Sequence, residues 1–179
     1  MRDTDSSNAR TARPITREWL FRAASHYLER YASTEANLRR VLERKVMRRA
    51  HLRGEEPGEF EPLIGETVAR FVDLKLIDDR SFAEARLASL RRRGTSLRQT
   101  AAKLAEKGVD RETVATVLAG DETDEAEAAR RLAKRRRLGP HRLRDRAERR
   151  DRDIAALMRA GFSYKHASDA IDGEADSQD

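Results

Sequence analysis

Apolar side chains recur along this chain at intervals of three and four residues, the spacing that gathers them on one face of an α-helix. Leu38, Val41, Leu42 and Val46 are typical, and every position between them carries a charged side chain. Glycine, proline and helix-capping residues interrupt the pattern at short intervals, and no stretch shows the alternation of a convincing strand. The pattern therefore predicts an all-α protein made of short helices.

The junction at residues 70–82 organises the rest of the chain. Phe71 and Val72 continue a helical spacing into it, and Asp78 and Asp79 then offer side-chain oxygens that can cap a new helix. One helix is therefore expected to end in this junction and another to begin there.

Capping residues and glycines predict where the other helices begin and end. Helix starts are expected at Thr16, at Ser33 or Thr34, at Thr95 or Ser96, and at Asp110. Helix ends are expected at Gly108 and Gly161, because glycine readily adopts the left-handed conformation that follows a last helical turn. Residues 54–62 hold four glutamates, two prolines and two glycines, and predict an acidic loop.

The helical pattern repeats along the chain. A shift of 62 positions places Thr34 on Ser96, and a shift of 53 places Gly108 on Gly161. The sequence therefore predicts three tandem three-helix repeats, each too small to be stable without its neighbours. The expected divisions are a flexible arm at 1–15, repeats at 16–77, 78–120 and 121–172, and an acidic tail at 173–179.

Charge is distributed along the chain in blocks. The 179 residues carry a net charge of +6, and 39% of them are charged against 38% hydrophobic, so much of the chain must stay solvated. Residues 33–53, 86–107 and 134–152 carry +5, +6 and +7, whereas residues 54–66 carry −5. Such blocks favour a polyanion or an acidic protein surface as the partner, although ordinary solvated helix faces have the same composition.

The sequence offers no catalytic or metal-binding constellation. His26, His51, His141 and His166 are scattered without the spacing of metal ligands, and there is no phosphate-cradling glycine loop. We therefore expect no enzyme activity and no cofactor. The lack of cysteine, of an apolar run of about 20 residues and of a signal-peptide core predicts a cytoplasmic protein that does not enter a membrane.

Three short motifs in a fixed order resemble those of one bacterial family. They are Leu-Ile-Asp-Asp-Arg-Ser-Phe-Ala at 76–83, Lys-Gly-Val at 107–109 and Arg-Ala-Gly-Phe-Ser at 159–163. Together they resemble the RecX family of bacterial recombination regulators, over about residues 20–171. Asn37 and Ala160 depart from the residues that are usual in that family.

The resemblance implies a monomer whose tandem three-helix repeats form an elongated, curved, solenoid-like rod. It also implies binding in the groove of the RecA–DNA filament, which limits filament extension, ATP hydrolysis, strand exchange and coprotease activity. This would place the protein in homologous recombination, DNA repair and the SOS response. Weak, salt-sensitive and non-specific binding to single- and double-stranded DNA is expected in addition to binding of the recombinase.

Basic side chains on the predicted helices are the candidate contacts for the filament and its DNA. Each repeat supplies a cluster, and a curved array would hold the clusters in one groove. The candidates are Arg39, Arg40, Arg44, Lys45, Arg91, Arg92, Arg93, Arg98, Lys103, Lys134, Arg135, Arg136, Arg137, Arg142 and Arg144. If six or more phosphates are neutralised, binding should weaken by roughly 10³ or more between about 50 and 200 mM salt.

Two other functions fit the same pattern. A sequence-tolerant DNA-binding module, or a helix-turn-helix-like transcription regulator, also combines three-helix units with basic helices. A helical scaffold that binds no nucleic acid is the third interpretation. Preference for one duplex sequence would favour a transcription regulator, and salt-insensitive binding of a partner would favour the scaffold.

Overall fold

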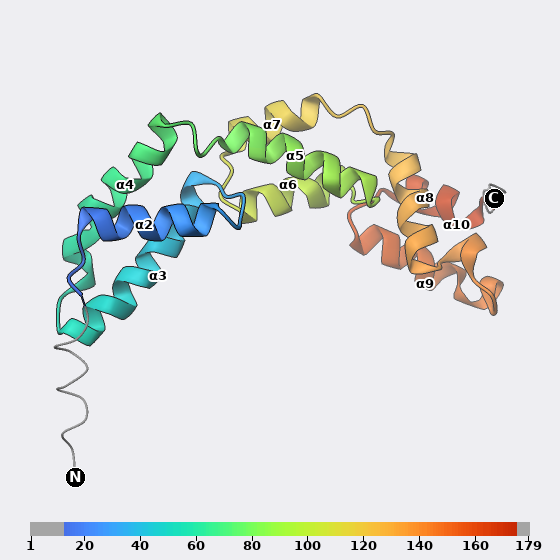
Figure 1. Cartoon of the computed structure of the whole chain (residues 1–179). Helices are drawn as coiled ribbons and strands as arrows, with labels where there is room; N and C mark the ends of the chain where they lie inside the picture. Colours follow the sequence, from blue (N-terminus) through green and yellow to red (C-terminus); the bar gives the residue numbers. More distant parts are fainter. Residues whose placement is uncertain (1–12, 175–179) are drawn as a thin grey trace, which may run out of the picture. The chain divides into compact units, whose positions relative to one another are not determined.

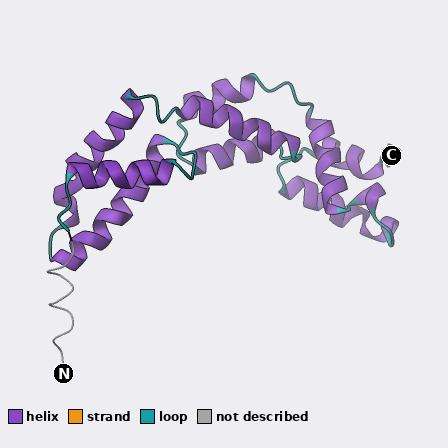
Figure 2. Ribbon diagram, in the orientation of Figure 1, coloured by secondary structure: helices purple, strands orange, loops and turns teal. Residues whose placement is uncertain are grey.

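The computed structural model describes residues 13–174, and this part of the chain is all-helical, as the apolar spacing predicts (Figure 1, Figure 2). It contains no strand between residues 13 and 174. The nine α-helices described in that range are α2 Arg17–Leu28, α3 Glu35–Arg53, α4 Glu61–Asp73, α5 Asp79–Arg92, α6 Leu97–Glu106, α7 Arg111–Ala119, α8 Glu125–Arg136, α9 Arg146–Arg159 and α10 Tyr164–Asp172. Two 3₁₀ turns, η1 Pro57–Phe60 and η2 Gly139–His141, precede α4 and α9. None of the helices in this range is both long and apolar enough to span a bilayer.

Side-chain caps start four of these helices where the sequence predicts them. Thr16, Thr34, Ser96 and Asp110 each accept a hydrogen bond from the backbone N–H three residues further on, at 2.9–3.2 Å. These bonds satisfy amide donors that no helical carbonyl can reach. The cap of α3 is therefore Thr34 rather than Ser33, and the cap of α6 is Ser96 rather than Thr95.

The two aspartates of the junction at 70–82 have different roles. Asp78 accepts from the Ser81 N–H at 2.9 Å and so caps α5. Asp79 instead accepts from the N–H of Glu35, the first residue of α3, at 2.8 Å. One carboxylate thus starts the helix locally, and the other ties the start of that helix to α3.

The chain divides into two compact units, Met1–Phe82 and Ala83–Asp179, and each contains a core of its own. In the first unit α2, α3 and α4 pack on one another, because each carries a stripe of apolar side chains at helical spacing. This core consists of Ile15, Leu20, Ala24, Leu38, Leu42, Val46, Ala50, Ile64, Val68, Phe71 and Ile77.

The second unit has its main core between α8, α9 and α10. The apolar positions of α8 are mostly alanine, which lets the other helices approach its backbone closely. This core consists of Ala128, Ala129, Leu132, Ala133, Leu138, Ile154, Leu157, Ala160, Phe162, Ala167, Ala170 and Ile171. Helices α5 to α7 bury a smaller set, Ala83, Leu87, Leu90, Leu104, Val114 and Val117.

Gly94 lets the chain that follows α5 approach the backbone of α8. Its φ is +72°, and a Cβ at this position would lie 2.6 Å from the Ala128 carbonyl oxygen and 2.6 Å from the Leu132 nitrogen. Both the left-handed backbone and the close approach require glycine here. The predicted helix ends at Gly108 and Gly161 are confirmed by positive φ angles of 87° and 95°.

The structure differs from two of the predicted boundaries. Ile15, assigned to the flexible arm, is 7% exposed and belongs to the core of the first unit. Residues 54–62, expected to be a loop, contain η1 and the start of α4, because Pro57 and Pro62 lie in first helical turns, where the missing N–H is no loss. Residues 1–12 of the predicted arm and 175–179 of the tail lie outside the described residues. The three-repeat division and the curved rod stay predictions.

Candidate functional site

In the first unit the predicted basic side chains lie on α3. Arg40, Arg44 and Lys45 are exposed. The apolar stripe of α3 packs into the core, and these three side chains lie outside that stripe. Arg39 is half-buried and turns toward α4, where a Cβ added to Gly65 would lie 3.7 Å from its Nη1. Three of the four predicted contacts of this repeat are therefore on the surface.

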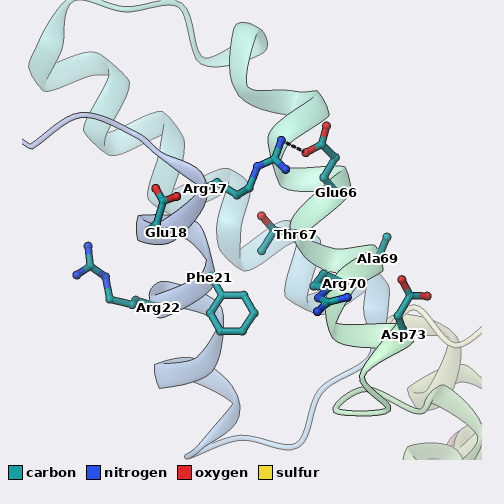
Figure 3. A pocket seen from close by; sticks show the side chains of 9 residues that line it. All are labelled: Arg17, Glu18, Phe21, Arg22, Glu66, Thr67, Ala69, Arg70 and Asp73. Carbon is teal, nitrogen blue, oxygen red and sulfur yellow. Dashed lines mark ion pairs between the residues drawn. The ribbon is translucent and has the colours of Figure 1, made fainter.

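An open hollow of about 800 Å³ lies between α2 and α4 in the same unit (Figure 3). Phe21 of α2 is 39% exposed there, and its ring centroid lies 4.8 Å from that of Phe71. Arg17 and Glu66 pair at 2.6 Å at the edge of the hollow. None of the predicted basic contacts lines it, so this hollow is separate from the basic surface of α3.

Arg91 was predicted to lie on the basic surface, and this prediction is wrong. Its side chain is 1% exposed, and its guanidinium donates to four internal acceptors. Nε lies 2.6 Å from Asp121 Oδ2, and Nη1 lies 2.8 Å from Glu125 Oε2 and 2.6 Å from the Thr95 carbonyl. Nη2 donates to the Thr123 carbonyl at 2.7 Å. Arg91 therefore holds the segment between α7 and α8 against the end of α5.

Arg92 and Arg93, the next two residues, are exposed. Arg135 of α8 donates from Nη1 to the Arg93 carbonyl at 2.7 Å, so the ends of α5 and α8 lie side by side. We call Arg92, Arg93 and Arg135 the α5–α8 basic cluster. Exposed basic residues in and just after the last turn of α8 continue it, namely Lys134, Arg136 and Arg137.

The predicted contacts of α6 lie beside the turn between α9 and α10. A Cβ added to Gly161 in that turn would lie 3.4 Å from Cβ of Arg98, which is exposed, whereas Lys103 is half-buried. The Ser96 hydroxyl, which caps α6, donates to the Ala160 carbonyl at 2.6 Å. The start of α6 is thereby fixed against the end of α9.

Arg142 is held by Asp153 and is not a free surface cation. Its Nε and Nη2 each lie 2.6 Å from an oxygen of Asp153, which is 2% exposed and also accepts from the Gly139 N–H at 2.9 Å. Burial raises the pKa of Asp153, but the hydrogen bonds from Arg142 and Gly139 outweigh it and hold the pKa below the ordinary carboxyl value. The pair braces the segment before α9. Arg144, the last predicted contact, is exposed.

Replacing Asp153 by asparagine is expected to lower the free energy of unfolding by about 2 kcal/mol at pH 7, because charged hydrogen bonds to Arg142 and Gly139 are lost. A carboxyl whose pKa is lowered by folding stabilises above its unfolded pKa, and that stability disappears as the pH falls through the folded pKa. The difference between the two proteins should therefore shrink below about pH 4. Urea unfolding at a series of pH values measures it, and a difference that stays constant down to the lowest pH would contradict the assignment.

A second hollow, of about 430 Å³, lies along α9. It is lined by Leu138, Arg142, Arg149, Arg152, Asp153, Ala155, Ala156 and Arg159. Arg149, Arg152 and Arg159 were not among the predicted contacts. Their spacing of three to seven residues along one helix could have indicated that they share a face. Net charge counted over a block of residues does not show which side chains lie on the same face.

Within the described range 13–174, no three His, Asp or Glu side chains gather as a metal site would require. The molecule is thus defined by short capped helices and arginine-rich surfaces. It belongs to the class of all-helical proteins with exposed polybasic helix faces.

Comparisons with known proteins show the family to which the chain belongs. A family model described as "RecX, second three-helix domain" matches residues 78–118. A protein named "Regulatory protein RecX" from Myxococcus xanthus (strain DK1622) is 43% identical over 164 residues, which cover 89% of this chain and 88% of that protein. Proteins of the same name from Agrobacterium fabrum and Thermobifida fusca are 33% and 35% identical, covering 88% and 74% of this chain and 85% and 74% of their own lengths. No solved structure matches. The chain belongs to the RecX family of regulatory proteins.

Proposed function

We propose that this protein is a negative regulator of a RecA-type recombinase. It binds in the groove of the recombinase–DNA filament and limits filament extension, ATP hydrolysis, strand exchange and coprotease activity. The observation that carries the proposal is its membership of the RecX family over nearly nine tenths of the chain, 89% against the M. xanthus relative. The exposed cations of α3 and of the α5–α8 basic cluster support it, because a filament of protein and DNA is a polyanion.

The proposed action is mechanical. Basic helix faces attach the protein to the filament, and the bulk of its helices then obstructs the addition of recombinase protomers and the access of other partners. Such a regulator needs no catalytic group of its own.

The experiment that tests the proposal is a titration of this protein into a recombinase that hydrolyses ATP on single-stranded DNA. Inhibition is expected at amounts well below one molecule per recombinase protomer, and it should weaken at higher salt. Binding to the same DNA without recombinase is the control. Tight DNA binding without any inhibition would overturn the proposal in favour of a DNA-binding module or transcription regulator, which would also favour one duplex sequence over random DNA.

Replacing Arg92 and Arg93 together by glutamine should raise the amount needed for half-inhibition about tenfold, because two phosphate or carboxylate contacts are lost. The backbone bond from Arg135 to the Arg93 carbonyl does not depend on the side chain at 93, so helicity should be unchanged.

The matched control for this pair replaces Arg111 and Arg130 by glutamine. These two arginines are also exposed and lie on α7 and α8. It removes the same charge and should leave inhibition within about twofold, as substitutions outside a binding surface do. Equal loss in both variants would show that only net charge matters.

A further inference from the structure

We propose that the hollow along α9 is a phosphate-binding site for nucleic acid, with Arg149, Arg152 and Arg159 as its three phosphate-contacting side chains. We call these three residues the α9 arginine site. The inference rests on the proposed function, and it deepens it by assigning a DNA contact of the regulator to residues outside the predicted set.

Helical geometry brings the three arginines onto one stripe. In α9, Arg149, Arg152, Ala156 and Arg159 follow one another at intervals of three or four residues, and all line the same hollow. Over these positions the helix rises about 15 Å. A strand of nucleic acid carries a phosphate for every 3.4 Å or so along a duplex, so a stripe of this length faces several phosphates.

The other arginines of α9 already have internal partners. Arg150 donates to both carboxylate oxygens of Asp172 at 2.6 Å, and Arg146 donates to the Gly173 carbonyl at 2.8 Å. The guanidinium groups of the α9 arginine site, by contrast, make no hydrogen bond or ion pair with any residue between 13 and 174. The stripe therefore presents three exposed guanidinium groups that are hydrogen-bonded to no residue of the described range.

The one acidic group in the hollow, Asp153, is bound by Arg142 and is also close enough to Arg149 for that charge to lower its pKa further. Asp153 lies in its wall with both oxygens bound to Arg142, and one of them also accepts from the Gly139 N–H. This carboxylate is 2% exposed and its charge is matched by Arg142. The same bonds hold the segment from 138 to 142, whose Leu138 and Arg142 also line the hollow, so this part of the site is formed before any ligand arrives.

The lining favours a phosphate backbone over an acidic protein surface. A guanidinium presents two parallel N–H donors that match two phosphate oxygens or two carboxylate oxygens, so the rest of the lining decides between them. Ala155 and Ala156 also line the hollow, and their short side chains leave room for a sugar-phosphate chain to approach. Aromatic residues are enriched at the centre of protein interfaces, and none lines this hollow, whereas interfaces with DNA are strongly basic.

The test replaces Arg149, Arg152 and Arg159 together by glutamine and measures binding of a labelled single-stranded oligonucleotide of mixed sequence, without recombinase, over a series of salt concentrations. Affinity at low salt is expected to fall at least tenfold. The slope of log affinity against log salt should become shallower by about 2, because about 0.7 counterions are released for each of three phosphates.

The matched control replaces Arg22, Arg111 and Arg130, which are exposed on α2, α7 and α8. It removes the same charge and is expected to leave the slope unchanged. Circular dichroism and thermal unfolding of both triple variants establish that each is folded.

Two outcomes would overturn the assignment: native DNA binding by the α9 variant, and an equal loss in both variants. If the α9 variant binds DNA as the unaltered protein does but has lost affinity for purified recombinase, the stripe is a protein contact. Failure of the proposed function is seen separately, as the absence of ATPase inhibition by the unaltered protein. If the α9 variant loses DNA binding and the unaltered protein does not inhibit the recombinase, the phosphate-binding site is supported and the proposed regulatory function is rejected.

Discussion

Replacing Arg91 by alanine is expected to lower the free energy of unfolding by about 3–5 kcal/mol, the cost of breaking a buried ion pair by removing one partner. Asp121 and Glu125, whose side chains are 8% and 19% exposed, would lose the guanidinium with which both now pair. The carbonyls of Thr95 and Thr123 would also lose their donor. The effect is large because one side chain satisfies four acceptors.

Urea unfolding followed by circular dichroism measures this change, with Arg92→Ala as the matched control. Arg92 is adjacent and exposed, so its replacement should alter stability by no more than about 0.5 kcal/mol. Similar stabilities for the two variants would contradict the role given to Arg91. Any loss of filament inhibition in Arg91→Ala must be attributed to the fold, since this guanidinium cannot reach a partner.

Replacing Gly94 by alanine should cost about 2–5 kcal/mol. A left-handed backbone costs a residue with a Cβ about 1–2 kcal/mol, and forcing an extra atom into a packed contact costs about 1–3 more. The atoms it would meet, 2.6 Å away, are backbone atoms of α8 at Ala128 and Leu132, which cannot turn aside as a side chain can. Helix α8 must therefore move away from the end of α5.

Gly54→Ala is the control that separates these two costs. Gly54 also has a left-handed φ, +67°, but a Cβ there meets nothing within 4 Å. Its replacement should cost only about 1–2 kcal/mol. Thermal unfolding of both variants tests the comparison, and equal destabilisation would mean that the contact between Gly94 and α8 contributes nothing.

Local features of the fold could be predicted from the sequence because they depend on near neighbours. A cap such as Asp110 needs only an amide three residues away, and a helix end such as Gly108 needs only its own backbone angle. The boundary at Ile15 was missed because its burial depends on the packing of helices distant in sequence.

The candidate site was harder to predict for the same reason. Arg91 stands in a run of three arginines, and its acceptors Asp121 and Glu125 follow 30 and 34 positions later. One local sign was present: position 91 continues the stripe of Leu87 and Leu90, the buried face of α5. Net charge per block counts all basic residues equally. It therefore cannot distinguish a guanidinium that is buried in internal ion pairs from one that is exposed and can bind a partner.

The hydroxyl of Ser96 couples the fraying of the first turn of α6 to the undocking of the end of α9, two events that are usually independent. It accepts from the Gln99 N–H in the first turn of α6 and donates to the Ala160 carbonyl, 64 positions away in the sequence. The first turn of an ordinary helix frays by itself, whereas here fraying must also break the contact with the end of α9. The first turn of α6 and the turn after α9 therefore form one cooperative opening unit, and amide hydrogen exchange at Gln99 reports the docking of α9 as well as the local stability of α6.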